Sequence, residues 1–288
     1  MKTRGIASLQ FFGIASLLFY IWSMEFKNKI VWITGASSGI GEALAYEFAT
    51  QGAHLVLSAR REGELQRVAQ SCEIHGGSVL VLPFDMVDLP SHSKQVNQVL
   101  QTYGRIDVLV LNAGVSQRSF VLDTKFEVYR SLFEVNFFSI VHLVQQVIPV
   151  FQKQHAGVFV PIASVAGRIS TPRRAAYGAT KHALIGFFDS VRAELHGHGV
   201  QVSTIMPGYI RTEISLHAMN EDGEKYGKMD PNQAKGLDPN ITAQKIVHAV
   251  SQGKNYFFVG GALERFGLIV QRLFPSIVPW MLRKIKNT

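Results

Sequence analysis

Cysteine, charged residues and candidate metal ligands are scarce in this 288-residue sequence. Its single cysteine, Cys72, has no partner, which excludes a disulfide-stabilised scaffold. Charged residues make up only 17% of the chain and hydrophobic residues 47%, a balance that excludes an intrinsically disordered protein. Of the ten histidines, only His196 and His198 form a close pair, and no acidic residue or cysteine completes a ligand set, so no metal is expected.

The formal net charge of +8 is unevenly distributed along the chain. Residues 1–29 hold four basic residues against one acidic residue, and residues 260–288 hold five against one. The chain between them holds 20 basic and 19 acidic residues, so it is nearly neutral. The sequence shows neither a recognition helix nor aromatic residues interleaved with basic ones, so we expect no nucleic-acid partner. Positive charge flanks the two ends of the chain instead, which points to a membrane surface.

The N-terminus contains an uncharged stretch long enough to span a bilayer. Residues 5–24 form a run of 20 residues without a charge, and a helix of that length spans a hydrocarbon core of ~30 Å. Basic residues flank the run on both sides, and Tyr20 and Trp22 lie near one end, where interfacial aromatic residues occur. We therefore expect residues 1–26 to be a single uncleaved membrane anchor. The alternatives are a signal peptide, for which no small-residue cleavage site is present, and a buried helix of a soluble protein.

Residues 261–288 mix apolar and basic side chains. Pro275 and Pro279 prevent the segment from forming one straight helix. An apolar surface edged by basic residues is typical of a segment that lies in the membrane interface. Packing against the core or against a second subunit of a homo-oligomer is the alternative.

Between these ends, short apolar runs alternate with amphipathic stretches. Strands are predicted at residues 29–34, 54–59, 78–83, 107–111, 157–162, 200–206 and 256–259. Helices are predicted near residues 42–51, 62–73, 91–103, 128–153, 177–196 and 242–251. This alternation predicts an α/β fold with a Rossmann-type doubly wound parallel sheet of about seven strands, in a single domain over residues 27–260 with apolar N- and C-terminal extensions. Ligands of such a sheet bind at the carboxyl ends of the strands.

A glycine-rich turn joins the first predicted strand to the first predicted helix. Its residues are Gly35, Ser37, Ser38, Gly39, Ile40 and Gly41 around Ala36. Glycines let backbone N–H groups approach a pyrophosphate, and the helix N-terminus adds favourable partial charge. The turn therefore indicates a dinucleotide site. The end of the second strand indicates which dinucleotide, because Arg60 and Arg61 occupy the place where NAD-binding proteins carry an acidic residue. This favours NADP, and a solvated arginine pair is the alternative.

Tyr177 and Lys181 are four residues apart on a predicted helix, so the phenol and the ammonium group share one face. A nearby ammonium group lowers the pKa of a tyrosine and suits it to exchange a proton with a reacting carbonyl. Ser164 follows the predicted strand at residues 157–162, where its hydroxyl can hydrogen-bond the same oxygen.

Together these motifs resemble the short-chain dehydrogenases/reductases in order and spacing over roughly residues 26–260. The resemblance rests on Thr34 and the glycine-rich turn, Asn112-Ala113-Gly114, Asn136, Ser164, Tyr177 with Lys181, and Pro207-Gly208. The chain looks most like the membrane-anchored 7B-type branch of the dehydrogenase/reductases, given its apolar N-terminus, the Ile210 and Thr212 that follow Pro207-Gly208, and residues 225–230. Leu111 replaces the first asparagine that the family has before Asn112.

The resemblance implies a role for each matching residue. Tyr177 would be the general acid/base, Lys181 would lower its pKa and bind the nicotinamide ribose, and Ser164 would polarise the carbonyl. Asn136 would hold a water in a proton relay. The cofactor would be contacted further by Asp85 at the adenine, by Asn112, Ala113 and Gly114 along the cleft, and by Pro207, Gly208, Ile210 and Thr212.

The implied activity is NADP(H)-dependent oxidoreduction of a ketone or secondary alcohol on a lipid or other hydrophobic substrate. The resemblance allows an acyl- or alkyl-dihydroxyacetone phosphate, a steroid, a retinoid or a 3-oxoacyl chain. Arg118, Arg168, Arg173 and Arg174 fall near loops that border the cleft and could hold a phosphate, although solvation of most of them is the favoured interpretation. Residues 212–237 suggest a mobile substrate lid. The rival hypothesis is a catalytically idle, membrane-tethered NADP-binding scaffold or sensor.

Overall fold

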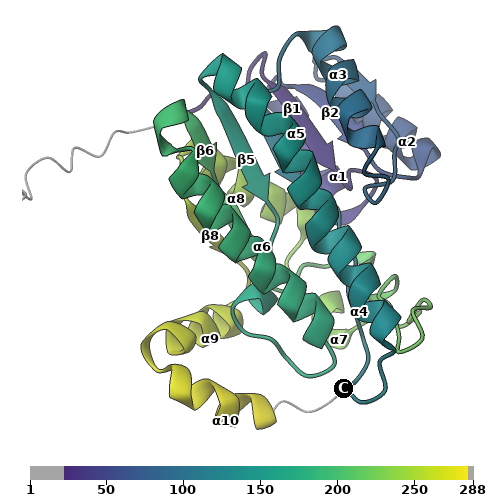
Figure 1. Ribbon diagram of the computed structural model, residues 1–288, viewed down its shortest axis with the longest axis vertical. Coiled ribbons are helices and arrows are strands. Elements are labelled where there is room, and N and C mark those ends of the chain that lie inside the picture. Colours follow the sequence, from purple (N-terminus) through teal and green to yellow (C-terminus); the bar gives the residue numbers. More distant parts are fainter. Residues whose placement is uncertain (1–22, 285–288) are drawn as a thin grey trace, which may run out of the picture.

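A six-stranded parallel sheet forms the centre of the computed structural model, which describes residues 23–284 (Figure 1). Its strands lie in the order β3-β2-β1-β4-β5-β6, so the order reverses between β1 and β4. Their bounds are β1 Ile30–Thr34, β2 His54–Ser58, β3 Val79–Val81, β4 Val108–Leu111, β5 Gly157–Pro161 and β6 Val200–Val202. A ligand cleft is expected at that reversal, outside the carboxyl ends of β1 and β4.

The strand predicted over residues 200–206 is divided into two. Ser203 separates β6 from β7 (Thr204–Pro207), and β7 pairs in parallel with β8 (Tyr256–Val259) in a small second sheet. The division is local, because the Ala163 N–H donates to the Ile205 carbonyl at 2.8 Å and continues the contact between β5 and β7. The predicted doubly wound parallel sheet and single-domain architecture are therefore confirmed, with one strand broken.

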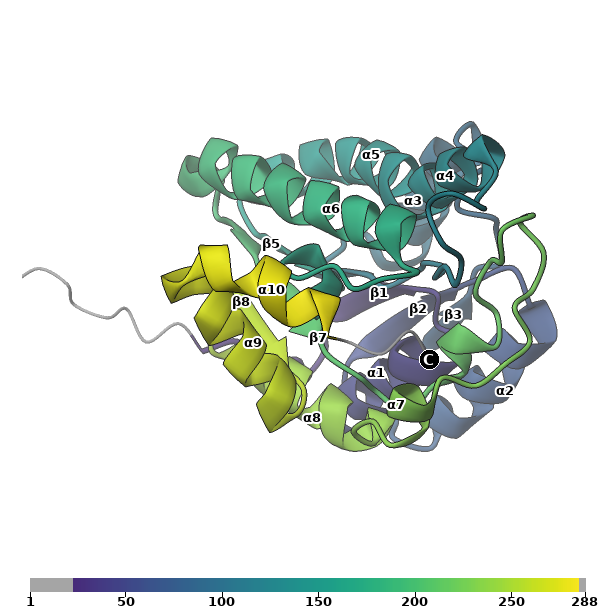
Figure 2. The same cartoon turned by 90° about the horizontal axis from the view of Figure 1, so that it is seen from below.

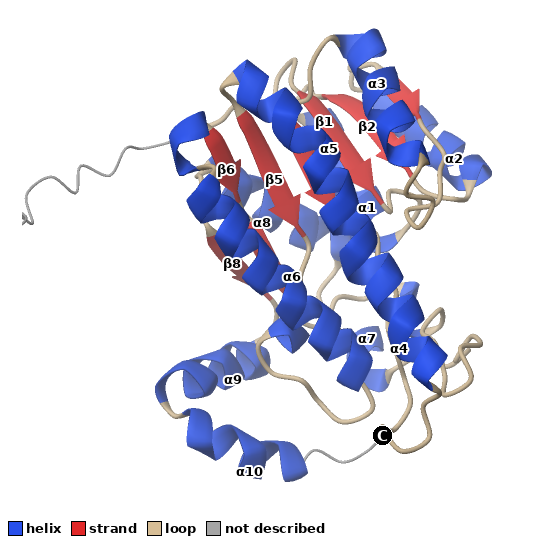
Figure 3. Ribbon diagram, viewed as in Figure 1, coloured by secondary structure: helices blue, strands red, loops and turns tan. Residues whose placement is uncertain are grey.

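Helices cover both faces of the main sheet, which Figure 3 shows as red strands between blue helical layers. One face carries α1 (Gly39–Thr50), α2 (Glu62–Glu73) and α8 (Pro239–Ser251), and the other carries α3 (Ser91–Tyr103), α5 (Ser139–Gln154) and α6 (Ala175–Glu194), as Figure 2 shows. Strand β1 illustrates why two cores form. Val31 and Ile33 pack into one core and Ile30 and Trp32 into the other, because successive strand side chains point to opposite faces.

The helix predicted over residues 128–153 has three parts. Helix α4 (Phe126–Phe133) runs through a π-helical segment (Glu134–Phe138) into α5. Among the described residues this is the one helix long and apolar enough to cross a membrane, by length and composition alone. Leu143, Val144 and Val147 on its inner side are fully buried against the sheet, so it serves as a core helix here.

The membrane anchor expected over residues 1–26 lies outside the described residues up to residue 22. The packed domain already includes the residues just after that point. The Met24 N–H donates to the Ser251 carbonyl at 2.9 Å, and Phe26 is 1% exposed with its ring edge-to-face on Phe48 at 4.9 Å between centroids. The folded domain therefore begins before residue 27.

The C-terminal segment forms a helical hairpin beyond the carboxyl ends of the strands (Figure 1). Helix α9 (Ala262–Leu273) is followed by a short turn and by α10 (Val278–Arg283). Pro275 lies in the break between the helices, as predicted, whereas Pro279 lies in the first turn of α10. The segment is therefore not one straight helix, as predicted. In the first turn of α10, Pro279 costs no intrahelical hydrogen bond, because the N–H groups of a first turn have no intrahelical acceptor.

Candidate active site

The glycine-rich turn between β1 and α1 has a geometry that excludes side chains. Gly35 and Gly39 have φ angles of +65° and +62°, which L-residues rarely adopt. A Cβ atom on Gly41 would lie 2.2 Å from the Gly35 carbonyl oxygen, and one on Gly35 would lie 2.9 Å from the Ala113 Cα. The loops that follow β1 and β4 therefore approach each other closely, beside the N-terminus of α1, as a pyrophosphate cradle requires.

Asn112 and Thr34 hold this approach in place. The Asn112 Nδ2 donates to the Thr34 and Gly35 carbonyls at 3.2 and 3.0 Å. The Thr34 hydroxyl oxygen accepts from the N–H groups of Asn112 and Ala113 at 3.1 and 3.2 Å. The Asn112 side chain thus shapes the glycine-rich turn.

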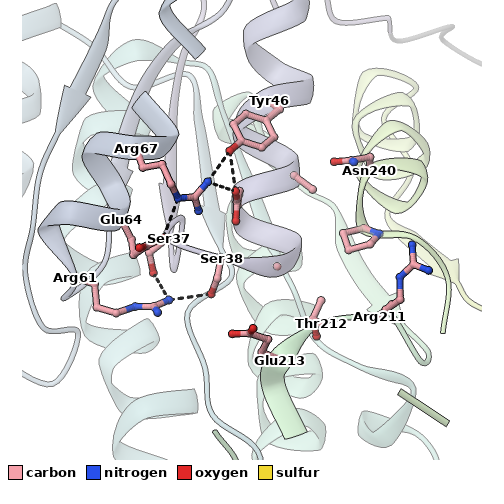
Figure 4. A pocket seen from close by; sticks show the side chains of 14 residues that line it. Ser37, Ser38, Tyr46, Arg61, Glu64, Arg67, Arg211, Thr212, Glu213 and Asn240 are labelled. Atoms are coloured by element: carbon pink, nitrogen blue, oxygen red, sulfur yellow. Dashed lines mark hydrogen bonds and ion pairs between the residues drawn. The ribbon is translucent and has the colours of Figure 1, made fainter. Parts of the chain in front are cut away.

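Arg61 reaches the glycine-rich turn from the start of α2. Its Nη2 donates to the hydroxyls of Ser37 and Ser38, both at 3.1 Å, in a cleft of about 570 Å³ (Figure 4). In the same cleft Arg67 is held by the carboxylates of Glu42 and Glu64 at 2.8 and 2.9 Å. Within residues 23–284, the Arg61 guanidinium donates hydrogen bonds only to hydroxyl groups and forms no ion pair. One guanidinium and two hydroxyls therefore converge where an anionic group can bind.

Arg60 and Asp85 lie apart from this cluster. Arg60 is 73% exposed and its guanidinium lies 3.8 Å from the Asp85 carboxylate, a surface ion pair. The other Asp85 oxygen accepts from the Val87 N–H at 3.2 Å. Of the two arginines predicted at the cofactor, only Arg61 contacts the glycine-rich turn.

Ser164, Tyr177 and Lys181 meet beyond the carboxyl end of β5. The Ser164 Oγ accepts from the Ala166 N–H at 3.1 Å and so begins the short turn after the strand. The Lys181 Nζ donates to the Ile162 carbonyl at 2.9 Å and lies 5.8 Å from the centroid of the Tyr177 ring. Tyr177 is 8% and Lys181 4% exposed, so both titratable groups are buried at this site.

Burial dominates the ionisation of both groups. Desolvation raises the pKa of Tyr177 above its usual value, and the Ser164 hydroxyl and the charges of Arg174 and Arg118 oppose that rise. Desolvation alone lowers the pKa of Lys181 to about 8. We expected Lys181 to lower the pKa of Tyr177. In the structure the groups that do so are Ser164 and the two arginines.

Asn136 lies in the π-helical segment between α4 and α5 and is fully buried. Its Nδ2 donates to the Val115 carbonyl at 2.9 Å and to the Thr180 hydroxyl at 3.1 Å, while its Oδ1 accepts from the Val115 N–H at 2.8 Å. A Cβ on Gly114 would lie 3.1 Å from that Oδ1 and 3.6 Å from the Lys181 Nζ. Asn136 therefore links the loop after β4 to α6 next to Lys181. Short π-helical segments frequently occur at functional sites.

The loop after β7 closes the other side of the cleft. The Gly208 N–H donates to the Val259 carbonyl at 2.8 Å, and the Ser164 hydroxyl donates to the Pro207 carbonyl at 3.5 Å. Ile210 is 1% exposed, so its side chain belongs to the core. A Cβ on Gly39 would lie 3.1 Å from the Thr212 methyl group. Of the predicted contacts in this loop, Thr212 lies directly against the glycine-rich turn.

Comparison with known proteins places this arrangement in a family. The model of the short chain dehydrogenase family matches residues 29–222. The chain belongs to the short-chain dehydrogenase/reductase family. It is 40% identical over 263 residues to the dehydrogenase/reductase SDR family protein 7-like of Anopheles gambiae, covering 90% of this chain and 83% of that one. It is 38% identical to member 7B of Xenopus tropicalis, covering 87% and 83%.

Other relatives agree with this membership. Human dehydrogenase/reductase SDR family member 7 is 44% identical over 212 residues, which cover 70% of this chain and 62% of that one. The structure of a short chain dehydrogenase/reductase from Burkholderia phymatum in complex with NAD superposes with a TM-score of 0.79 at 25% identity, covering 90% of this chain and 96% of that one. The predicted family resemblance is therefore confirmed, and an oxidoreductase that binds a nicotinamide cofactor follows from it.

Asp230 of this short-chain dehydrogenase/reductase was not predicted as a site residue. In the structure it pairs with both Arg118 and Arg174. Arg168 is exposed and Arg173 stacks on two aromatic rings, so the four arginines do not form one group. Asp230 is 112 and 56 residues from its partners, and no local spacing in the sequence indicates such a contact.

The segment at residues 212–237, expected to be a lid, has regular contacts in the structure. Met219 pairs with Gln117 and Lys225 through β-bridges, and Gln233 is 6% exposed in the short helix α7 (Pro231–Ala234). The segment thus packs over the cleft through main-chain hydrogen bonds, and it carries Asp230 to the arginines.

Proposed function

We propose that this chain is an NADP(H)-dependent oxidoreductase that reduces a ketone, or oxidises a secondary alcohol, on a lipid or other hydrophobic substrate. The observation that carries the proposal is the convergence of Ser164, Tyr177 and Lys181 at the carboxyl end of β5, beside the cradle formed by Gly35 and Gly41. An idle nucleotide-binding protein has no need for a buried hydroxyl, phenol and amine at one point.

Each residue has a specific task in this proposal. A nicotinamide bound in the cleft supplies or accepts the hydride. Tyr177 donates a proton to the carbonyl oxygen during reduction, and burial keeps its phenol protonated at neutral pH because the pKa is raised. The Ser164 hydroxyl donates a hydrogen bond to the same oxygen. Lys181 orients the cofactor ribose, and one acceptor site of the Asn136 Oδ1 remains for a water that links Lys181 to solvent.

The preference for NADP is supported by the surroundings of Arg61. The end of β2 carries no acidic residue to bind a ribose 2′-hydroxyl, and Arg61 with Ser37 and Ser38 offers three donors suited to a 2′-phosphate. We expect Arg61→Ala to weaken NADPH binding about tenfold or more and to leave NADH binding nearly unchanged. Cofactor fluorescence titrations measure both affinities, and Arg60→Ala is the matched control.

A membrane-attached enzyme would be suited to a hydrophobic substrate. We propose that the apolar segment before Met24 anchors the protein and that the α9–α10 hairpin rests on the bilayer. The exposed fractions of Leu263, Leu273 and Phe274 are 80%, 60% and 58%, and Trp280 is 56% exposed with the Lys284 Nζ 3.8 Å from its ring centroid. An apolar face with basic residues near it suits a lipid–water interface. The hairpin also contacts the cleft, because Glu264 accepts from the Tyr209 N–H at 3.1 Å.

The proposal is tested by NADPH oxidation with a panel of lipid ketones in detergent. We expect turnover of at least one ketone by the wild type and a loss of about two to four orders of magnitude in Tyr177→Phe, because general acid catalysis contributes about that much. Unchanged turnover by Tyr177→Phe would overturn the mechanism. Tight NADPH binding without turnover of any carbonyl would favour the membrane-tethered scaffold or sensor.

A further inference from the structure

Two buried arginines near Tyr177 share a single carboxylate oxygen. The Nη2 atoms of Arg118 and Arg174 both lie 2.8 Å from Oδ2 of Asp230. The side chains of Arg118, Arg174 and Asp230 are 5%, 14% and 10% exposed. They come from the loop after β4, the residue that precedes α6, and the segment that packs over the cleft.

The charges in this cluster do not balance. Two guanidinium groups face one carboxylate, which leaves one positive charge in a region largely removed from water, and a buried charge without a partner is costly. The Nη1 of Arg118 donates to the Gln117 carbonyl at 3.1 Å, a neutral acceptor. Burial and the neighbouring Arg174 lower the pKa of Arg118, as expected where positive charge is in excess. A second anion would restore the balance.

The cluster also lies beside the reacting position. Arg174 precedes Tyr177 by three residues, and the charges of both arginines act on the phenol, because they lower its pKa against the effect of burial. The Arg174 guanidinium lies 5.2 Å from the ring centroid of Tyr209, which follows Pro207 and Gly208. One substrate molecule could therefore place its carbonyl against Tyr177 and Ser164 and an anionic group against the two arginines.

The two oxygens of Asp230 have separate tasks. Oδ1 accepts from the N–H groups of Asn232 and Gln233 at 2.8 and 3.2 Å and caps α7. Oδ2 faces the arginines. The arginine-facing oxygen is thus a fixed internal anion that partly neutralises the pair, while the cap is maintained by the other oxygen.

We propose that Arg118 and Arg174 bind an anionic group of the substrate, a carboxylate or a phosphate, and that Asp230 limits the strength of that binding. This inference rests on the proposed oxidoreductase function and adds a substrate class to it: a hydrophobic ketone that carries an oxyanion. The arginines act on specificity through charge-assisted hydrogen bonds.

Kinetics with a matched pair of ketones test the proposal in the full-length enzyme. The pair is a long-chain keto acid and its methyl ester, and the quantity measured is the ratio of their kcat/KM values. We expect Arg174→Gln to lower the ratio about 10- to 100-fold, the effect of losing a charge-assisted hydrogen bond. We expect Asp230→Asn to raise it, since the asparagine keeps the helix cap and removes the competing charge. Arg130→Gln, an exposed change on α4, is the control.

The two variants are expected to change the kcat/KM ratio in opposite directions, which distinguishes substrate binding from a structural role. Damage to the fold would lower kcat/KM for both ketones in both variants and leave the ratio unchanged, and that result would overturn the inference. Failure of the wild type to reduce either ketone would count against the proposed function itself. A binding measurement keeps the anion site testable in that case. It is made with saturating NADPH, because phosphate could otherwise also bind at Arg61, Ser37 and Ser38. Inorganic phosphate should then raise the thermal unfolding midpoint of the wild type and not that of Arg174→Gln or Arg118→Gln. Equal shifts in all three would refute the site.

Discussion

Lys181 shows how burial sets the chemistry of a single residue. Its ammonium group has one described partner, the Ile162 carbonyl, and desolvation lowers its pKa to about 8. The i,i+4 spacing correctly placed Lys181 next to Tyr177, yet it could not reveal that the Nζ turns to a main-chain carbonyl. A sequence motif specifies which residues are neighbours, and the electrostatic effect depends on desolvation that only the packed structure defines.

The lowered pKa predicts how stability depends on pH. Between pH 8 and 10.5 the unfolded chain holds the Lys181 proton and the folded chain releases it, so the unfolded state binds more protons and stability rises with pH. Below pH 8 the folded protein bears the full cost of a buried charge, on the order of 3 kcal/mol.

Urea unfolding of the cofactor-free wild type and Lys181→Met measures this effect. We expect the free energy of unfolding of the wild type to approach that of the variant as the pH increases from about 7 to about 9.5. A difference that stays constant over this range would contradict the assigned pKa.

At the scale of elements, we propose that the β1–α1 turn forms the site at which the nucleotide binds. Gly41 has no room for a Cβ, because that atom would lie 2.2 Å from the Gly35 carbonyl oxygen and 2.5 Å from the Asn112 Nδ2. Gly63 in α2 provides a matched control, since a Cβ there meets no atom within 4 Å. Comparing alanine substitutions at the two positions distinguishes the effect of close packing at Gly41 from the general helix preference of alanine.

We expect Gly41→Ala to destabilise the fold by about 1–3 kcal/mol and to abolish NADPH binding, because the loops after β1 and β4 must separate. Gly63→Ala should be neutral or slightly stabilising. Thermal unfolding and cofactor titration of both variants check this. Normal NADPH affinity in Gly41→Ala would show that the turn does not form the cradle.

The bounds of some helices and strands could be predicted from the sequence, and those of others could not. The bounds of α2, α3 and β8 match the predicted ranges, because each element has a clear periodicity and ends in turn residues. The interruption at Ser203 was not predicted, because it depends on a distant part of the chain. The Ser203 hydroxyl donates to the carbonyl of Lys254, in the turn that leads into β8, at 2.7 Å. The Asp230 cluster escaped prediction for the same reason, since its members are brought together by the fold alone.

At the scale of the whole molecule, the catalytic cleft and the α9–α10 hairpin lie at the same end of the sheet (Figure 1). The exposed apolar residues of the hairpin and its basic residues Arg272 and Arg283 suit a bilayer surface. A hydrophobic ketone would then reach the cleft from the membrane without crossing water. This arrangement relates the uneven charge of the chain to its proposed function.

Membrane fractionation tests this arrangement. The full chain should remain in the membrane fraction after an alkaline carbonate wash, as expected for a spanning anchor. Deletion of residues 1–22 should release the protein from that fraction and leave weak, salt-sensitive binding to anionic vesicles. Arg272→Glu with Arg283→Glu should abolish the remaining binding, since each basic residue contributes about 1 kcal/mol at such a surface. A full chain that washes into buffer would contradict the anchor.

In the proposed reaction, Tyr177 protonates a carbonyl that receives a hydride in this cleft. Single-turnover reduction of a lipid ketone by NADPH carrying deuterium at the transferred position tests it most directly. We predict that mass spectrometry finds one deuterium on the product carbinol carbon with the wild type, and that Tyr177→Phe forms this product at least about a hundredfold more slowly while binding NADPH with similar affinity. Deuterated alcohol formed at the same rate by both proteins would contradict the account.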